Sequence, residues 1–273
     1  MSGMLYVVGT PIGNLEDLTQ RGMRVLGEVD LIAAEDTRVA RKLLNYLGSK
    51  TRTLSFNEFN AHRRVPQVLE ALREGDVAIV TDAGMPGVSD PGASLVAAAA
   101  AAGFRVAGVP GPSAVTTALA VSGMRGDSFR FLGFLPRTSG ARTKLLEKHV
   151  AAPETLIAYE APHRLQAALR DVKLVLGNRR IAVCRELTKL HEEVFRGVLE
   201  EAIEYFGDPR GEFVLVVEGA GKDSAVSTVA DTQVAEAMQA ARLKGISRRE
   251  AAIKVAATLG VPRRRAYQFW EAG

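Results

Sequence analysis

The feature that most constrains this chain is a regular alternation of short apolar segments and helical segments along its first 120 residues. This alternation is typical of an open, mostly parallel α/β sheet whose strands are buried. The expected strands are Leu5–Val8, Leu31–Ala34, Thr53–Phe56, Val77–Thr81 and Val106–Val109. The expected helices are Thr19–Leu26, Thr37–Leu47, His62–Arg73 and Ala93–Ala102, with Gly103 at the C′ position of the last one.

A second series of strands begins near Ser128, and a purely helical region follows it. The expected strands are Phe129–Gly133, Thr155–Tyr159, Ile181–Arg185, Glu193–Arg196 and Glu212–Glu218. The junction between the two series is expected at Gly123–Asp127, and Gly219–Thr228 has the composition of a linker. We therefore predict two α/β domains, residues 1–122 and 123–222, and a basic helical module at residues 230–273.

Three signals define the helical region at the end of the chain. Ser247 and Glu250 have the spacing of a capping box, in which the two side chains satisfy free backbone amides at a helix start. Gly260 is expected to end that helix, and Pro262 suits the first turn of the next.

Composition excludes several classes of protein. Cys184 is the only cysteine, so neither a disulfide framework nor a cysteine-based zinc cluster is expected, and a reducing compartment is indicated. The longest apolar run, Leu95–Ala102, is far shorter than the roughly 20 residues that span a bilayer. The first strand begins without a preceding signal peptide. We expect a cytoplasmic protein with no membrane segment.

The net charge of +4 resides in the helical region alone. From Ala230 onward there are eight basic and four acidic residues, whereas the rest of the chain is balanced. A basic cluster indicates a polyanionic partner, although a solvated helical face explains it equally well.

The loops expected at the carboxyl ends of the strands carry the chemistry, because ligands bind there in parallel sheets. The first strand is followed by Gly9–Asn14, which alone is a weak signal. The fourth is followed by Thr81–Gly92, a loop rich in Gly, Pro and Asp whose carboxylates suit hydroxyls or an ammonium group. The fifth is followed by Pro110–Ala114, which suits a carboxylate or a ribose, although Ser113 is also a plausible helix N-cap.

Four charged clusters also follow strands. They are Glu35–Arg38, Asn57–Asn60, Glu160–Arg164 and Arg185–Lys189. Charged residues are usually solvated, but four groups placed directly after apolar strands favour a shared cleft.

Taken together, these motifs resemble one family. The segments VGTPIGNLEDLT, AEDTR, TDAGMPGVSDPG, VPGPSA, YEAPHR, RELTKLHEE and GEFVLVVEG, in this order, resemble the 16S rRNA (cytidine-2′-O)-methyltransferases of the tetrapyrrole methylase superfamily. The resemblance covers roughly Leu5 to Trp270. It implies two α/β domains with S-adenosylmethionine in the cleft between them, a homodimer, and methylation of a ribose 2′ oxygen of a cytidine in the decoding region of the small ribosomal subunit.

The resemblance also implies where the cofactor binds. Carried over by motif, the contacts are Pro11, Asp82, Met85, Ser113 and Ala114, together with Tyr159 and the backbone near Cys184 and Val217. The chain departs from the family pattern at Phe59, where many relatives carry histidine. Either this position is not essential, or it contacts RNA by stacking.

The reaction requires positioning and a proton acceptor, because a ribose hydroxyl is a poor nucleophile at neutral pH. The candidate acceptors are Asp36, Glu58, Glu160 and His163. His163 is equally suited to capping a helix or to holding Glu160 in place. The candidates for binding RNA phosphates are Arg38, Arg164, Arg185 and Lys189, with Arg263, Arg264 and Arg265 in the tail. No metal is expected.

Two other functions remain open at this point. An enzyme of the same fold could methylate a small molecule such as a tetrapyrrole precursor, since fold does not decide function. A non-catalytic DNA-binding protein would explain the helix-turn-helix outline of the tail but not the strand-end loops.

Overall fold

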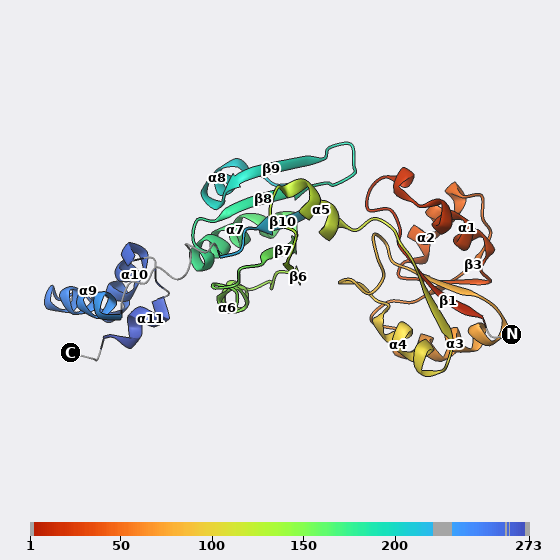
Figure 1. The fold of residues 1–273 in the computed structure, drawn as a ribbon, viewed down its shortest axis with the longest axis horizontal. Helices are drawn as coiled ribbons and strands as arrows, with labels where there is room; N and C mark the ends of the chain where they lie inside the picture. Colours follow the sequence, from red (N-terminus) through yellow and green to blue (C-terminus); the bar gives the residue numbers. More distant parts are fainter. Residues whose placement is uncertain (1–2, 221–230, 260, 262, 271–273) are drawn as a thin grey trace. The chain divides into compact units, whose positions relative to one another are not determined.

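The first five strands form one parallel sheet in the computed structural model, which describes residues 3–220, 231–259, 261 and 263–270 (Figure 1). The strands are β1 (Met4–Val8), β2 (Leu31–Ala34), β3 (Arg52–Ser55), β4 (Val77–Val80) and β5 (Arg105–Val109). Their order is β3-β2-β4-β1-β5, and every neighbouring pair is parallel. All residues of β2 and β4 are buried, because helices cover both faces. The expected strands are confirmed to within one or two residues.

Helices cover the two faces of this sheet in pairs. They are α1 (Gln20–Glu28), α2 (Thr37–Tyr46), α3 (Ala61–Glu74) and α4 (Ala93–Ala101). A 3-10 turn at Leu15–Asp17 precedes α1, and α5 (Ala114–Ser122) follows β5. The core on one face contains buried residues of α1 and α2, and the core on the other contains buried residues of α3 and α4. The connections of β1 and β4 therefore leave the sheet on opposite faces.

The ends of these helices follow the capping signals of the sequence. The Thr19 hydroxyl accepts a hydrogen bond from the Gly22 amide at 3.0 Å at the start of α1. Gly103, with a φ of +82°, takes the C′ position after α4. Its amide donates to the Ala100 carbonyl, and the Phe104 amide donates to the Ala99 carbonyl, which is a Schellman motif. The expected end of this helix is confirmed.

The second sheet is mixed. It contains β6 (Phe129–Phe134), β7 (Thr155–Glu160), β8 (Arg180–Arg185), β9 (Glu193–Val198) and β10 (Phe213–Val217), in the order β6-β7-β10-β8-β9. β6 and β7 are parallel, whereas β7 and β10 are antiparallel. β10, the last strand among the described residues, thus lies in the centre and joins the pair β6–β7 to the pair β8–β9.

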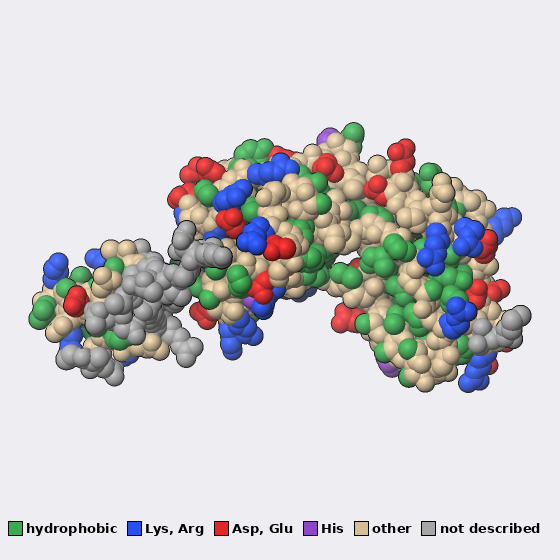
Figure 2. Space-filling model, in the orientation of Figure 1, with side chains coloured by type: hydrophobic (Ala, Val, Ile, Leu, Met, Phe, Trp, Pro, Cys, Tyr) green, Lys and Arg blue, Asp and Glu red, His purple; other side chains and the backbone are tan. Residues whose placement is uncertain are grey.

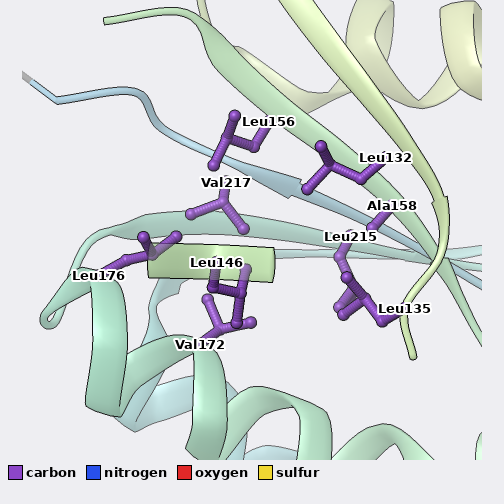
Figure 3. Close-up of a pocket in the computed structure, with 9 residues that line it drawn as sticks. All are labelled: Leu132, Leu135, Leu146, Leu156, Ala158, Val172, Leu176, Leu215 and Val217. Atoms are coloured by element: carbon purple, nitrogen blue, oxygen red, sulfur yellow. The ribbon is translucent and has the colours of Figure 1, made fainter. Parts of the chain in front are cut away.

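Three helices pack on one face of the second sheet and share one core with it. They are α6 (Ser139–Glu147), α7 (Pro162–Leu176) and α8 (Leu199–Tyr205). Within this core, nine apolar side chains surround a void of about 10 Å³, at most the room of one water molecule (Figure 3). The void is a packing gap, not a ligand site.

The C-terminal helices have a core of their own. α9 (Asp231–Leu243), α10 (Arg248–Leu259) and α11 (Arg263–Gln268) pack around Val234, Met238 and Val255. Ser247 precedes α10, and its hydroxyl accepts from the Glu250 amide at 3.4 Å while contacting the Glu250 carboxylate at 3.0 Å. The carboxylate therefore contacts the hydroxyl, where the capping box predicts a backbone amide. Gly260, Pro262 and most of the expected linker lie outside the described residues.

Contacts divide the chain into two compact units, Met1–Val121 with Cys184–Val194, and Ser122–Val183 with Phe195–Gly273. The three expected domains remain a prediction. In the described parts of the chain, no helix has both the length and the apolar character needed to span a membrane.

Candidate active site

The carboxyl ends of β1 and β4 form the switch point of the first sheet. The strands are neighbours, but the following helices, α1 and α4, lie on opposite faces. In open α/β sheets, ligands bind at the carboxyl edge where neighbouring connections diverge in this way. The loops that the sequence selected after these two strands therefore occupy the position at which this fold class binds ligands.

Three strand-end loops are joined to each other. Thr10 and Gly84 exchange two backbone hydrogen bonds of 2.9 and 3.0 Å, which tie the loop after β1 to the loop after β4. The loop after β5 joins them by close approach, since a Cβ atom on Gly111 would lie 2.8 Å from the backbone of Gly9. The three joined loops, with the first residue of α5, contain the predicted cofactor residues Pro11, Asp82, Met85, Ser113 and Ala114.

The loop between β4 and α4 has a constrained backbone. Gly84, Gly87 and Gly92 have positive φ angles, and so does Ser89 at +62°. A non-glycine residue in this region is uncommon and stores strain, which is often found in ligand-binding loops. At the start of the loop, the buried hydroxyl of Thr81 has no hydrogen-bond partner among the described residues. The loop therefore offers a fixed backbone and an unsatisfied polar atom.

Three carboxylates lie together at the ends of β2 and β4. The Glu35 carboxylate accepts from the Asp82 amide at 3.3 Å, and the Asp82 carboxylate accepts from the Asp36 amide at 3.2 Å. Asp90 is the third, close enough to Glu35 and Asp82 for their charges to act on it. Within the described ranges, no group of three or more His, Cys, Asp or Glu side chains has the arrangement of a metal site.

These carboxylates have altered pKa values. Burial and then the negative charges of Glu35 and Asp82 raise the pKa of Asp90 to about 6. Burial also raises the pKa of Glu35 and that of Asp82. A cation bound among these carboxylates would stabilise their charged forms and so lower their pKa values. The sequence alone assigned no role to Glu35, although Glu35 lies in one of the charged clusters that it selected, and it proposed Asp90 only as one of the loop carboxylates that suit hydroxyls or an ammonium group.

Asp36 and Arg38, predicted as a proton acceptor and a phosphate ligand, bind each other. The Asp36 carboxylate caps α2 by accepting from the Arg38 amide at 2.8 Å, and it also pairs with the Arg38 guanidinium. Hydrogen bonds from Arg38 lower the pKa of Asp36 to about 2. A carboxylate with a low pKa is a weak proton acceptor, so this geometry favours a structural role for Asp36.

Glu58 and Phe59 lie on a rigid turn after β3. The side-chain oxygens of Asn57 and Asn60 each accept from the backbone amide of the other residue, at 3.1 and 2.9 Å. Glu58 is exposed, and Phe59 is 87% exposed. The turn therefore holds an accessible carboxylate and an accessible aromatic ring.

In the second unit, Glu160 is fully buried at the end of β7. One of its oxygens accepts from the Ala161 amide at 2.8 Å and pairs with Arg164 at 2.6 Å, while the other has no described partner. Burial raises the pKa of Glu160. Arg164, not His163, is the side chain that holds Glu160, and His163 is exposed in the first turn of α7.

The remaining predicted cofactor contacts differ in accessibility. Tyr159 is half-buried, with its ring 4.9 Å from Phe131 and 5.3 Å from Phe134 between centroids. Cys184 is fully buried. The Val217 side chain points into the void of the second core (Figure 3). A contact by Val217 is therefore limited to its backbone, as the resemblance implied.

The other predicted phosphate ligands also have acidic neighbours. Arg185 pairs with Glu193 at 3.2 Å, and Lys189 pairs with Glu186 at 2.9 Å. An incoming phosphate would have to compete with these carboxylates. The side chains of Arg263, Arg264 and Arg265 lie outside the described residues.

Basic side chains are not confined to the tail. Figure 2 shows Lys and Arg interleaved with Asp and Glu on the visible faces of the α/β parts. On the tail, Arg242, Lys244 and Arg249 are exposed. Phe269 and Trp270 pack against the tail's own core.

The fold and its strand-end site define a class. Residues 4–203 match the family described as tetrapyrrole (corrin/porphyrin) methylases, and the chain belongs to this family and is a methyltransferase. A non-catalytic DNA-binding protein is thereby excluded. The structure of a diphthine synthase shares the fold, with a TM-score of 0.63 and 15% identity over 79% of this chain and 90% of that one.

Within that class, the chain is similar to proteins named ribosomal RNA small subunit methyltransferase I. The protein of Halalkalibacterium halodurans is 44% identical over 98% of this chain and 94% of its own length. The protein of Thermotoga maritima is 49% identical over 80% of this chain and 99% of its own length. About a fifth of this chain thus has no counterpart in the second relative.

Proposed function

We propose that this methyltransferase transfers a methyl group from S-adenosylmethionine to a ribose 2′ oxygen of a cytidine in 16S rRNA, in the decoding region of the small ribosomal subunit. The observation that supports this substrate is the 44% identity, over nearly the whole chain, to a relative named for the small-subunit rRNA. The site at the switch point of the first sheet supports the chemistry.

The residues at this site fit the proposed cofactor. S-adenosylmethionine supplies a methyl group on a positively charged sulfur and also carries an ammonium group. Glu35, Asp82 and Asp90 give the site negative charge, which suits both the charged sulfur and the ammonium group. The close packing of Gly9 on Gly111 leaves backbone accessible where a side chain would intrude. The unsatisfied Thr81 hydroxyl adds a polar atom.

The acceptor of the ribose proton is proposed to be Glu58 or His163. Asp36 is engaged by Arg38, and the Glu160 side chain has no exposed surface. Glu58 and His163 are both exposed. A general base must reach the proton that it removes, so the exposure of Glu58 and His163 supports them over Asp36 and Glu160.

Glu58→Gln and His163→Gln test this assignment. The residue that acts as base should, when changed, lower kcat by tenfold or more with the Kd of S-adenosylmethionine unchanged. A kcat within a few-fold of wild type in the double variant would contradict a base at either position. Positioning would then carry the reaction.

Arg38, Arg185 and Lys189 are proposed to bind RNA phosphates through exchange of their acidic partners. Arg164, the fourth predicted phosphate ligand, is only 17% exposed and binds Glu160 and the Leu135 carbonyl, so a structural role is proposed for it instead. Arg38 is the most accessible, with 87% of its side chain exposed. The tail is proposed to add RNA backbone contacts without being part of the methyl-transfer site. The Thermotoga maritima relative, which lacks a counterpart to about a fifth of this chain, is consistent with a catalytic body that does not need every segment.

Methylation of a small molecule is the second candidate, because the family takes its name from tetrapyrrole substrates. Incorporation of labelled methyl groups into 16S rRNA, small ribosomal subunits and a tetrapyrrole precursor separates the two. Mass spectrometry of the RNA product then locates the methyl group. Incorporation into the tetrapyrrole alone would refute the proposal.

A homodimer in the cytoplasm completes the proposal. Light scattering during size-exclusion chromatography measures the mass, and a monomer of 29.2 kDa at all concentrations would contradict the dimer.

A further inference from the structure

Two arginines from different helices, the buried Arg142 of α6 and the half-buried Arg164 of α7, hold the loop between β6 and α6. The Arg142 guanidinium donates to the carbonyls of Pro136 and Arg137, at 3.0 and 3.5 Å. The Arg164 guanidinium donates to the Leu135 carbonyl at 3.2 Å. Three consecutive carbonyls of one loop thus accept hydrogen bonds from two arginine side chains.

Each arginine also forms an ion pair with a carboxylate. Arg142 is 3% exposed and pairs with Asp171 of α7, its Nε lying 2.8 Å from the carboxylate. Arg164 is 17% exposed and pairs with Glu160. A guanidinium has five donors in a fixed plane, so each arginine binds its carboxylate and the loop carbonyls together. The backbone at Leu135–Arg137 is therefore fixed from within the second unit.

A β-bulge immediately before this loop sets the direction of Phe134. Phe131 pairs with Ile157 and Phe134 pairs with Tyr159, so β6 has one residue more than β7 between these two pairs. Gly133 has a φ of +66°, a conformation that a side chain disfavours. Bulges commonly redirect a side chain at a site. Here the Phe134 ring remains 58% exposed at the carboxyl end of its strand, beside Tyr159.

The fixed loop also presents an arginine. The Arg137 side chain is exposed, and among the described residues no carboxylate pairs with it. In this it differs from Arg38, Arg164, Arg185 and Lys189, which all have acidic partners. An exposed ring and an exposed guanidinium on one rigid loop match the two chemical parts of a single-stranded polynucleotide. Bases stack on aromatic faces, and phosphates bind guanidinium groups.

We propose that Phe134 and Arg137 form an RNA contact of the methyltransferase, in which Phe134 stacks on a nucleobase and Arg137 binds a neighbouring phosphate. Arg142 and Arg164 act as positioning residues that hold the loop for this contact. This inference rests on the proposed function, because it takes RNA as the substrate. It adds a recognition element that the strand-end motifs do not contain.

Two surface substitutions in the full-length protein test the contact. Arg137→Gln should raise the KM for RNA and reduce the slope of log affinity against log salt by about one, since one phosphate contact is lost. Phe134→Ser should weaken RNA binding at least about fivefold. The substrate is 16S rRNA or the small ribosomal subunit, whichever the wild type methylates. The Kd of S-adenosylmethionine should stay at the wild-type value in Arg137→Gln.

Matched controls come from the opposite edges of the sheets. Phe129 is the first residue of β6, Phe134 is the last, and Phe129 is 39% exposed. Phe129→Ser therefore removes an exposed ring at the amino end of the strand, away from the proposed contact. Arg105 is exposed at the amino end of β5. Phe129→Ser and Arg105→Gln should both retain the wild-type KM for RNA.

Arg142→Lys tests the positioning role. Lysine keeps the charge beside Asp171. Its single ammonium cannot replace both the Nε and Nη2 donors that bind the Asp171 carboxylate and the Nη1 donor that reaches the carbonyls of Pro136 and Arg137. The KM for RNA should rise as in Arg137→Gln, while kcat at saturating RNA should change less than twofold. If this variant fails to fold, the two surface variants still decide the matter.

Wild-type KM and salt slope in both Arg137→Gln and Phe134→Ser would overturn the inference. An equal loss of S-adenosylmethionine affinity in Arg137→Gln would also overturn it, because the loop would then belong to the cofactor pocket. A wild type that methylates no RNA substrate would instead refute the proposed function.

Discussion

Gly111→Ala tests whether the packing of backbone on backbone builds the proposed cofactor site. The added Cβ would lie 2.8 Å from the carbonyl carbon, the Cα and the oxygen of Gly9. Ordinary contacts of this kind begin near 3.4 Å, so the two loops would have to separate by about 0.6 Å. Because the obstacle is backbone, a change of rotamer gives no relief.

The separation has a calculable consequence for stability and binding. Overpacking a close-packed site destabilises a protein by roughly 1–3 kcal/mol. Gly9 precedes Thr10, whose two hydrogen bonds to Gly84 tie in the loop after β4, so the shift reaches that loop as well. Displacement of a ligand-positioning group by about 1 Å lowers activity by up to about a hundredfold. We expect the affinity for S-adenosylmethionine to fall at least tenfold.

Gly108→Ala is the matched control, because Gly108 lies on β5, three residues before Gly111. A Cβ atom added to Gly108 would have no other atom within 4 Å, and the φ of this residue is not positive. Alanine there should leave stability unchanged or raise it by up to about 1 kcal/mol, by restricting the unfolded chain. Cofactor affinity should match the wild type.

Urea unfolding followed by circular dichroism measures the stability, and titration calorimetry measures the affinity. Fluorescence is unsuitable because the only tryptophan, Trp270, lies in the C-terminal module. If Gly111→Ala retained the wild-type stability and affinity, the loops would not form the site as argued. Equal losses in both variants would show that the close contact is not the cause.

Three further predictions concern charge. The affinity for S-adenosylmethionine should rise as the pH increases through about 6, because a cationic ligand favours ionised Asp90. The folded protein holds the Asp90 proton more tightly than an unfolded chain with a pKa near 3.8, so the contribution of Asp90 to the free energy of unfolding should fall between pH 4 and 6. Asp90→Asn should weaken both trends, as measured by calorimetry and urea titrations, and unchanged trends would contradict the role of Asp90. Arg142→Met should lower the free energy of unfolding by roughly 3–5 kcal/mol, because it leaves Asp171 unpaired. Adding Asp171→Leu should restore most of the lost stability, as measured by thermal unfolding. An equal loss of stability in the single and the double variant would contradict this prediction. Changing Arg263, Arg264 and Arg265 to glutamine should flatten the salt dependence of RNA binding by about two to three units, and an unchanged slope would mean that the tail packs rather than binds RNA.

The first sheet was predictable because parallel strands buried on both faces are continuous apolar runs. β2 shows this most clearly, since all four of its residues are buried and its expected and observed bounds agree. The end of α4 was predictable for a local reason, because Gly103 tolerates the left-handed backbone of a C′ residue. Signals of this kind need no knowledge of distant parts of the chain.

The site was predictable in its loops but not in its pairings. That Asp82 lies after a strand follows from the pattern, but its contact with Asp36 joins residues 46 positions apart. The partner of Arg142 is 29 positions away, so no spacing rule reveals it. The bulge in β6 was missed because the pattern ended the strand at Gly133, whereas an extra residue carries it on to Phe134. These contacts depend on the tertiary structure.

The central position of β10 affects the order in which the protein folds during synthesis. The first sheet uses only residues up to Val109, so all its strands are available when less than half of the chain has been made. In the second sheet, β7 and β8 stay without their shared neighbour until Phe213–Val217 emerges and inserts between them. Pairing over such a sequence separation is slow, and unpaired strand edges promote aggregation. The second unit should therefore be the last to fold and the one most dependent on chaperones, and a chain terminated before Phe213 should leave its first half intact and its second half unable to close.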